Sequence, residues 1–226
     1  MYRLIAKHHH VFRRYHLYTL IANILSLFLF AITLDGLFNR DWFGIIDGFV
    51  YSHVTYQSTF LTAFFTGITT LADPVNATII SLVCFVTLIS ERSWKHATLF
   101  FISISGSITL GIFLKAVTGV NRPDNSLIDI YSLSFPSNHT LFATVLALTV
   151  GWIYIRRLTK ERQIITALGL TLFVVLVGAS RIYLRVHWTS DVVAGAALGV
   201  FVVTSAILVM QILPLFVENF RKLLKK

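Results

Sequence analysis

The stretch RIYLRVHWTSDVVAGAALGVFVVTSAILVMQIL, residues 181–213, decides the fold of this chain. Its first eleven residues include two arginines, a histidine and an aspartate, whereas residues 192–213 are almost all apolar or small. A run of about 20 such residues is long enough to cross ~30 Å of hydrocarbon as a helix. Charged groups beside hydrocarbon are costly, so we interpret residues 181–191 as a functional site at the end of a membrane helix.

The whole chain has the composition of an integral membrane protein. Of its 226 residues, 56% are hydrophobic and only 13% are charged, and the mean hydropathy is +0.76. A soluble domain of this length does not need so much apolar sequence to fill one core. Five further runs are long enough to span a bilayer; they lie at residues 17–35, 75–90, 97–117, 138–156 and 163–181. We therefore predict an all-α membrane protein with six transmembrane helices, forming a single domain over residues 1–226.

Residues 36–73, between the first two predicted spans, have a different character. They are apolar but interrupted by aspartate and glycine, and their apolar stretches are short for a span. We predict interfacial helices lying near the outer membrane surface. At the end of this segment, Asp73 and Pro74 predict a helix start, with Asp73 as the N-cap and Pro74 in the first turn.

Lysine and arginine are distributed unequally between the two sides of the predicted bundle. One side carries 14 of the 19, and the positive-inside rule assigns that side, with both termini, to the cytoplasm. These residues are Arg3, Lys7, Arg13, Arg14, Arg92, Lys95, Arg156, Arg157, Lys160, Arg162, Arg221, Lys222, Lys225 and Lys226. Because they lie in short clusters between apolar segments, the net charge of +9 reflects membrane orientation, and we do not expect nucleic-acid binding.

Five basic residues remain for the opposite, extracytoplasmic side: Arg40, Lys115, Arg122, Arg181 and Arg185. The predicted topology brings three of them, Lys115, Arg122 and Arg181, to the same face as two histidines. Converging cations favour binding of a multiply charged anion, for which phosphate is the obvious candidate. Histidines beside such an anion favour proton or group transfer.

The two histidines are suited to different roles. Asp191 follows His187 by one helical turn, so it can accept a hydrogen bond from one ring nitrogen and leave the other free to attack phosphorus. His139, on another predicted helix, is placed to protonate the leaving oxygen. The same three residues are also potential metal ligands, but the surrounding cations would repel a divalent ion. We predict no metal and no other cofactor. The only cysteine, Cys84, lies in an apolar run, which excludes a disulfide framework and a cysteine metal site.

Three segments resemble the signature motifs of the type 2 phosphatidic acid phosphatase (PAP2) family, in order and in spacing. They are KAVTGVNRP (115–123), PSNH (136–139) and SRIYLRVHWTSD (180–191). The resemblance implies that His187 is a nucleophile that forms a phosphohistidine and that Asp191 orients it. It implies that His139 is the general acid and later the base that activates water.

The same resemblance implies a set of phosphate ligands. Lys115, Arg122, Arg181 and Ser137 would bind the phosphate oxygens together with nearby backbone N–H groups. Asn138 stands where the family usually has glycine. Glycine adopts positive φ readily and asparagine is among the few other residues that tolerate it, so we expect the anion-binding geometry to survive. A polar residue at this position also occurs in relatives that act on undecaprenyl diphosphate.

Three classes of function were compared. A transporter or scaffold explains only the spans, and a vanadate-dependent peroxidase, which resembles the same motifs, would have a soluble fold. A metal-independent membrane lipid phosphatase explains the cations, the histidines and the membrane together. The predicted partners are therefore the membrane and a lipid phosphate. Undecaprenyl diphosphate is the preferred substrate, and phosphatidylglycerophosphate or phosphatidic acid is the alternative. The sequence leaves the oligomeric state open.

Two glycines follow the His187–Asp191 pair at the same four-residue spacing. Gly195 and Gly199 form a G-x-x-x-G pattern on one face of the last predicted helix. Small residues at this spacing allow a neighbouring helix to approach closely. We expect packing inside the monomer, with dimerisation as the alternative.

Overall fold

The structure, a computed structural model, describes residues 2–38, 43–54, 57–130 and 132–223, with side chains described from residue 16 to residue 213. In this part of the chain every regular element is a helix, which confirms the all-α fold class. The helices are α1 (Tyr2–Phe38), α2 (Phe43–His53), α3 (Thr59–Thr70), α4 (Pro74–Ser90), α5 (Trp94–Thr118), α6 (Asn138–Tyr154), the 3-10 turn η1 (Ile155–Arg157), α7 (Lys160–Tyr183) and α8 (Thr189–Leu223).

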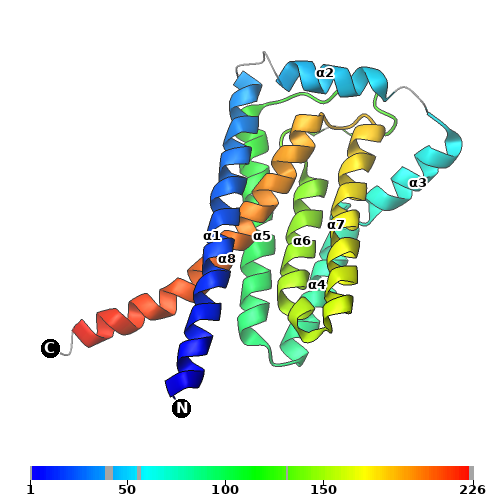
Figure 1. Cartoon of the computed structure of the whole chain (residues 1–226). Helices are drawn as coiled ribbons and strands as arrows, with labels where there is room; N and C mark the ends of the chain where they lie inside the picture. Colours follow the sequence, from blue (N-terminus) through cyan, green and yellow to red (C-terminus); the bar gives the residue numbers. More distant parts are fainter. Residues whose placement is uncertain (1, 39–42, 55–56, 131, 224–226) are drawn as a thin grey trace.

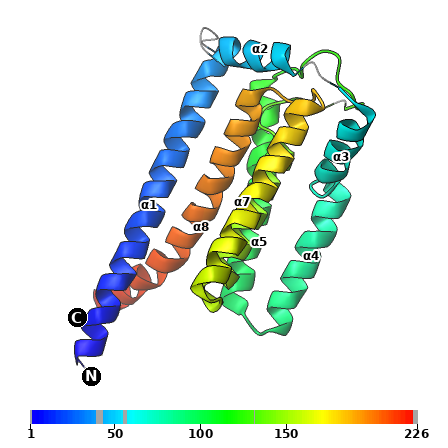
Figure 2. The same ribbon diagram turned by 45° about the vertical axis from the view of Figure 1, so that its right-hand side comes forward.

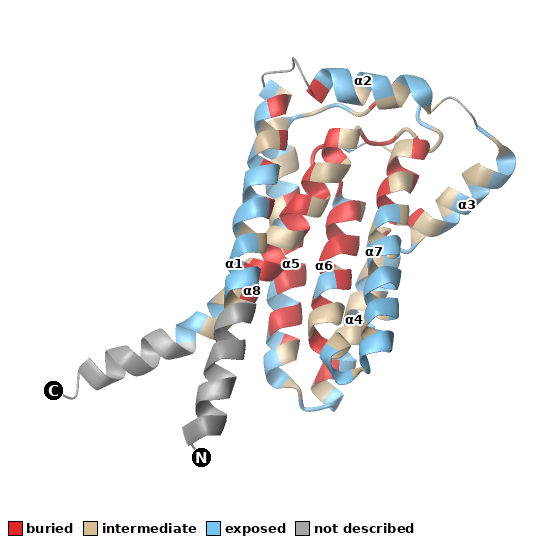
Figure 3. Cartoon of the chain, viewed as in Figure 1, coloured by how far each residue is buried: buried red, intermediate tan, exposed pale blue. Residues whose placement is uncertain are grey.

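The long helices run side by side as a bundle, and α2 lies across one end of it (Figures 1 and 2). Buried residues concentrate on α6 and on the half of α8 nearest α2, whereas α1, α4 and α7 carry many exposed residues (Figure 3). The exposed side chains include large apolar ones such as Phe28 on α1, Leu82 on α4 and Leu168 on α7. Such side chains are unfavourable in water and favourable in lipid, so the outside of the bundle suits a bilayer.

Among the described residues, five helices are individually long and apolar enough to cross a membrane: residues 16–38, 94–118, 138–157, 160–183 and 189–213. They match five of the six predicted spans to within a few residues. The remaining predicted span, residues 75–90, coincides with α4. This helix is long enough to cross a membrane only together with α3, and the two helices are bent by 44° relative to each other. The protein is therefore a multi-pass membrane protein, whereas the count of six and the interfacial position of α2 and α3 stay predictions.

Two helices are longer than predicted. α1 starts at Tyr2 rather than near residue 17, and α8 continues to Leu223 rather than ending near residue 213. The predicted limits marked the apolar runs, but lysine and arginine are good helix formers and allow a helix to continue beyond the apolar run. The side chains of residues 2–15 and 214–223 lie outside the described part of the structure.

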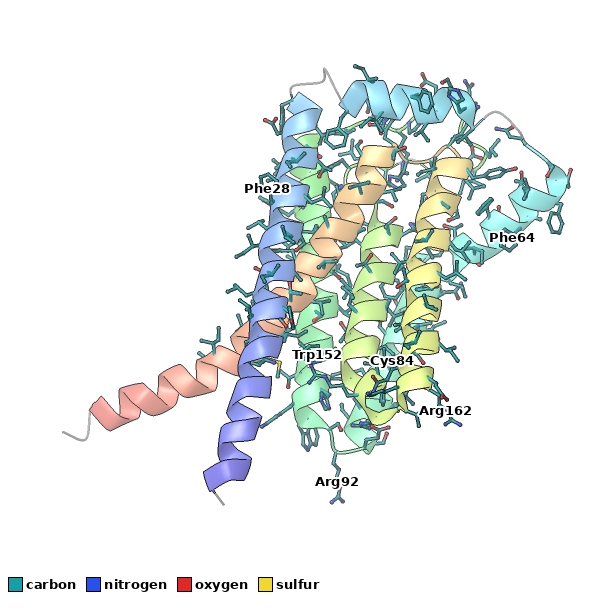
Figure 4. All side chains as sticks on the ribbon, in the orientation of Figure 1. Phe28, Phe64, Cys84, Arg92, Trp152 and Arg162 are labelled. Atoms are coloured by element: carbon teal, nitrogen blue, oxygen red, sulfur yellow. The ribbon has the colours of Figure 1, made fainter. Side chains whose placement is uncertain are left out.

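The two ends of the bundle differ in charge. The labelled side chains of Arg92 and Arg162 lie at the end opposite α2 (Figure 4). α1 also begins at that end, and the two loops with basic clusters, between α4 and α5 and between α6 and α7, turn there (Figure 1). The other end, beneath α2, is where α5 finishes and where α6 and α8 start.

Gly195 and Gly199 allow α8 to pack closely on α6. A Cβ atom at Gly195 would lie 2.6 Å from the backbone oxygen of Ser137, and one at Gly199 would lie 2.7 Å from the Cβ of Thr144. Real Cβ atoms do not tolerate such distances, so glycine is required for this approach. The predicted packing role inside the monomer is confirmed.

Polar contacts hold α2 against the start of α8. Asp47 accepts hydrogen bonds from the backbone N–H of Ser190 at 2.9 Å and from its hydroxyl at 2.6 Å. The guanidinium of Arg185 lies 4.8 Å from the ring centroid of Tyr51 and donates to the backbone oxygen of Val54 at 2.9 Å. Arg185, one of the five basic residues predicted to lie on the extracytoplasmic side, therefore holds α2 in place.

Candidate active site

His187 lies in the short turn between α7 and α8, and Asp191 lies in the first turn of α8. Their side chains are 1% and 0% exposed, and His187 Nδ1 is 3.1 Å from Asp191 Oδ2. This is the contact that the four-residue spacing predicts. When Nδ1–H donates a hydrogen bond to the carboxylate, Nε2 carries the lone pair that can react.

The carboxylate of Asp191 is itself fixed by two further donors. The backbone N–H of Trp188 lies 2.9 Å from Oδ2, and the hydroxyl of Ser134 makes a short hydrogen bond to the same oxygen. Ser134 Oγ also lies 3.2 Å from His187 Nδ1. Ser134 was not predicted from the sequence, although it lies only two residues before the PSNH motif. It belongs to the arrangement that holds the histidine–aspartate pair.

Arg122 lies on the other side of the His187 ring. Its Nη1 is 3.1 Å from His187 Nε2 and also donates to the backbone oxygen of Val186. Its Nε donates to the backbone oxygen of Ser132 at 2.7 Å, and its Nη2 donates to the hydroxyl of Ser132 at 2.9 Å. A cationic donor is therefore next to the ring nitrogen that is free of Asp191.

Lys115, near the end of α5, contacts the loop that precedes α6 and contains Ser132 and Ser134. Its Nζ donates to the backbone oxygens of Leu133 at 2.6 Å and Ser134 at 2.9 Å. These contacts hold the backbone of Leu133 and Ser134 and thereby help to position the Ser134 hydroxyl, which donates to Asp191. The structure thus brings Lys115 close to Arg122 and His187, with its ammonium group bound to backbone carbonyls.

Arg181 has donors that the described part of the protein does not use. Its side chain is 1% exposed, and Nη1 donates to the hydroxyl of Thr69 at 2.6 Å. Its Nε and Nη2 are buried without a hydrogen-bond partner among the described residues. Buried polar groups are nearly always paired, so the N–H donors on these two nitrogens are available to an anion. Thr69, on α3, was not identified from the sequence.

The charges around His187 determine its protonation state. Burial, together with the positive charges of Arg122, Arg181 and Lys115, lowers the pKa of His187 well below the ordinary 6.5. A neutral imidazole is the form that retains a nucleophilic lone pair. The surrounding cations therefore favour both an anionic ligand and a nucleophilic His187.

His139, the second residue of α6, is held by a partner that the sequence did not reveal. Its Nε2 lies 2.7 Å from Oδ1 of Asp73, at the start of α4. The prediction that Asp73 is an N-cap with Pro74 at the first position is confirmed. The carboxylate, however, makes no cap hydrogen bond and faces the histidine instead.

Ser137 and Asn138 lie at the start of α6. Ser137 is the N-cap of α6: its hydroxyl accepts from the Thr140 hydroxyl at 3.1 Å, and its N–H donates to the backbone oxygen of Asp191 at 3.0 Å. Asn138 is the first residue of α6 and is not among the residues with positive φ, so tolerance of positive φ is not required at this position. Its part in phosphate binding stays a prediction. Its side-chain oxygen would lie 2.6 Å from a Cβ at Gly111, so it packs closely on α5.

An apolar cavity of about 660 Å³ begins beside the histidine of α6. It is lined by α4, α5 and α6, with Asn138 and His139 among its lining residues. Ile112 and Phe100, which also line it, are twelve residues apart on α5, about 18 Å at 1.5 Å per residue. The cavity therefore extends about half the ~30 Å depth of a hydrocarbon core. Among the described residues no cluster of three or more His, Cys, Asp or Glu side chains is placed to hold a metal ion.

Comparison with known sequences identifies one superfamily. The pattern of the PAP2 superfamily matches residues 96–214. The undecaprenyl-diphosphatase of Sulfolobus acidocaldarius is 34% identical over 124 residues, which are 52% of this chain and 56% of that protein. Phosphatidylglycerophosphatase B of Bacillus subtilis is 34% identical over 82 residues, which are 34% of this chain and 40% of that protein. The chain thus spans about half the length of the curated relatives it matches.

Two crystal structures share the fold. A transmembrane PAP2 type phosphatidylglycerolphosphate phosphatase from B. subtilis superposes with a TM-score of 0.72 at 22% identity, covering 80% of this chain and 93% of that one. LpxE of Aquifex aeolicus superposes with a TM-score of 0.58 at 23% identity, covering 70% and 92%. At these identities the likeness concerns the arrangement of the helices.

Proposed function

The chain belongs to the PAP2 superfamily, and from this premise we propose that it hydrolyses a phosphate from a membrane lipid through a phosphohistidine on His187. The observation that carries the proposal is the position of the buried His187 between Asp191, 3.1 Å from Nδ1, and Arg122, 3.1 Å from Nε2. The carboxylate orients the ring, and the guanidinium can bind an oxygen of the phosphorus that Nε2 attacks.

In the first step Nε2 of His187 forms a bond to phosphorus while the bond from phosphorus to the leaving oxygen breaks. His139 donates a proton to that oxygen, which leaves as the lipid product. The proton on Nδ1 stays hydrogen-bonded to Asp191, which stabilises the positive charge on the ring. The phosphoryl oxygens are bound by Arg122 and by the unpaired Nε and Nη2 donors of Arg181.

In the second step His139 accepts a proton from water as the water oxygen bonds to phosphorus. The bond between phosphorus and His187 Nε2 breaks, inorganic phosphate leaves, and the neutral histidine is restored. Lys115 contributes positive charge and holds the loop of Ser134. Since three cations neutralise the phosphoryl group, the chemistry needs no divalent ion.

We propose undecaprenyl diphosphate as the substrate and undecaprenyl phosphate as the lipid product. The apolar cavity beside His139 suits a hydrocarbon tail that stays in the bilayer while the headgroup reaches the cations. The relative from S. acidocaldarius carries the name undecaprenyl-diphosphatase. Phosphatidylglycerophosphate is the second candidate because the B. subtilis relative is named for it, and phosphatidic acid is the third.

We place the reaction on the extracytoplasmic side of the cell membrane, with both termini in the cytoplasm. The support is that Arg92 and Arg162 lie at the end of the bundle opposite α2 (Figure 4), whereas the three motifs lie where α5 ends and where α6 and α8 start, near α2 (Figure 1). Single cysteines at Asp129 and Thr159, both exposed, test this in a Cys84→Ser background. A membrane-impermeant thiol reagent should label position 129 in intact cells and leave position 159 unlabelled; the reverse pattern would put the site in the cytoplasm.

The proposed substrate is tested with purified protein and a panel of three lipids: undecaprenyl diphosphate, phosphatidylglycerophosphate and phosphatidic acid. His187→Ala serves as the inactive control, and a soluble phosphate monoester reports the contribution of the tail. We expect the highest kcat/KM for undecaprenyl diphosphate and the lowest for the soluble ester. A kcat/KM at least tenfold higher for phosphatidylglycerophosphate, about 1.4 kcal/mol of transition-state preference, would reverse the ranking.

A further inference from the structure

Asp73 contacts the proposed active site from outside all three motifs and outside the residues 96–214 that match the superfamily. Its Oδ1 lies 2.7 Å from His139 Nε2, a short distance typical of hydrogen bonds between charged groups. The two residues are 66 positions apart in the chain. The His139 side chain is 14% exposed and that of Asp73 is 41% exposed, so the contact lies at the edge of the buried site.

The Asp73 side chain contacts His139 in place of the usual N-cap hydrogen bond to its own helix. An aspartate at the N-cap usually accepts a hydrogen bond from the backbone of the first helical turn. Asp73 has the extended N-cap backbone, with φ −65° and ψ 150°, and its backbone oxygen accepts from Ala77 at 2.8 Å. Its side chain nevertheless makes no cap bond. The carboxylate faces His139 instead of the helix that it begins.

The bend between α3 and α4 reaches the site a second time. Four residues before Asp73, the hydroxyl of Thr69 accepts a hydrogen bond from Arg181 Nη1 at 2.6 Å. One bend therefore contacts both the proposed general acid and a proposed phosphate ligand. It orients the two groups relative to each other.

The negative charge of Asp73 favours the protonated form of His139. A general acid must carry a proton before it can give one, and nearby cations such as Arg181 oppose protonation of His139. A carboxylate at hydrogen-bond distance stabilises the protonated ring. Asp191 has the equivalent relation to His187, since each carboxylate holds one ring nitrogen of one histidine.

We propose that Asp73 is a positioning residue for His139, holding Nε2–H so that Nδ1 is the nitrogen that exchanges a proton with the leaving oxygen. When the bond from phosphorus to that oxygen breaks, the oxygen takes the proton from Nδ1, and Nε2–H stays bound to Asp73. In the second step Nδ1 takes a proton from water as the water oxygen bonds to phosphorus and the bond to His187 breaks. The inference rests on the proposed function.

The test compares two substrates that differ in their need for a proton. The lipid phosphate is phosphatidic acid, a monoester whose alkoxide leaving group needs a proton, whereas the leaving group of p-nitrophenyl phosphate departs without protonation. Undecaprenyl diphosphate is unsuited to this comparison because its leaving group is itself a phosphate. Asp73→Asn keeps the size of the side chain and removes its charge. We expect kcat on the lipid phosphate to fall by about 10- to 100-fold, a part of the ~100- to 10,000-fold that a positioned acid contributes. On p-nitrophenyl phosphate the fall should be less than about threefold, because protonation then contributes little.

Three further variants separate a positioning role of Asp73 from general damage to the fold. Asp124→Asn removes an exposed carboxylate from the loop between α5 and α6 and should behave as the wild type. The double variant of Asp73→Asn with His139→Ala should be no slower than His139→Ala alone, because both changes disable the same acid. Asp73→Glu, which restores the charge, should recover part of the lost activity if the fold is intact.

An equal loss on both substrates, an unchanged kcat, or multiplicative effects in the double variant would overturn the role of Asp73. If the wild type hydrolysed neither substrate, the proposed function would fall. The pairing would still be judged from the ¹⁵N chemical shifts of the His139 ring. They should show a proton on Nε2 in the wild type and lose that preference in Asp73→Asn. Identical shifts in the two proteins would refute the pairing itself.

Discussion

Gly195→Ala should reduce activity without changing any residue of the proposed chemistry. The new Cβ would lie 2.6 Å from the backbone oxygen of Ser137, whereas ordinary contact begins at 3.4 Å. Because the obstacle is backbone, α8 and the first turn of α6 must separate by about 0.8 Å. Those two segments carry Asp191 and His139. A misplacement of about 1 Å can cost ~100-fold in rate, so we expect kcat to fall by about 10- to 100-fold.

The assay is steady-state hydrolysis of a lipid phosphate by the purified variant, with thermal unfolding measured in parallel. Overpacking of a core costs about 1–3 kcal/mol, so the variant should fold with a lowered Tm. Gly169→Ala on α7 is the matched control, because a Cβ there meets nothing within 4 Å. A fully active Gly195→Ala, or an equal loss in Gly169→Ala, would refute the reasoning that close α6–α8 packing sets the catalytic geometry.

Three further predictions concern the chemistry itself. Ser134→Ala removes one of three donors to the buried carboxylate of Asp191; a hydrogen bond to a charged group contributes about 1.5–3 kcal/mol, so kcat should fall at least about tenfold, and unchanged kinetics would exclude the role of Ser134. The lowered pKa of His187 keeps its ring neutral as the pH falls, so single-turnover phosphorylation by p-nitrophenyl phosphate should lose less than about half its rate between pH 7 and pH 6. An ordinary histidine would go from about three-quarters neutral at pH 7 to about one-quarter neutral at pH 6. A loss of about two-thirds of the rate would therefore contradict the burial argument. Activity should survive EDTA, because Lys115, Arg122 and Arg181 supply the positive charge around the phosphoryl group. If EDTA abolished activity and magnesium or zinc restored it, these three cations would not suffice.

The spans and the central pair were predictable from sequence because each depends on local spacing. About 20 apolar residues are needed to cross a bilayer whatever the helix packs against, so five helix positions followed from the apolar runs alone. Likewise, the four-residue spacing between His187 and Asp191 predicted their contact. His187 lies in the turn just before α8, but the chain there keeps the two side chains together.

The remaining contacts depend on how distant segments pack. Asp73 meets His139 across 66 residues, Ser134 meets Asp191 across 57, and Asp47 meets Ser190 across 143. No periodicity in the sequence encodes the bend after α3 or the position of α2 over α8. Asp73 was recognised only as a helix N-cap, because N-cap preference is local and the turn of its side chain toward another helix is not.

The central claim is that His187 carries the phosphoryl group, and it is tested most directly by trapping that group. Purified protein is mixed with undecaprenyl diphosphate labelled with ³²P in the terminal phosphate and quenched within the first turnover. We predict a label on the peptide containing His187, lost in acid and stable in alkali as expected of a phosphohistidine. The label should be absent from His187→Ala and should accumulate in His139→Ala, where hydrolysis lacks its base. A label that persisted in His187→Ala, or turnover by that variant at the wild-type rate, would contradict the account.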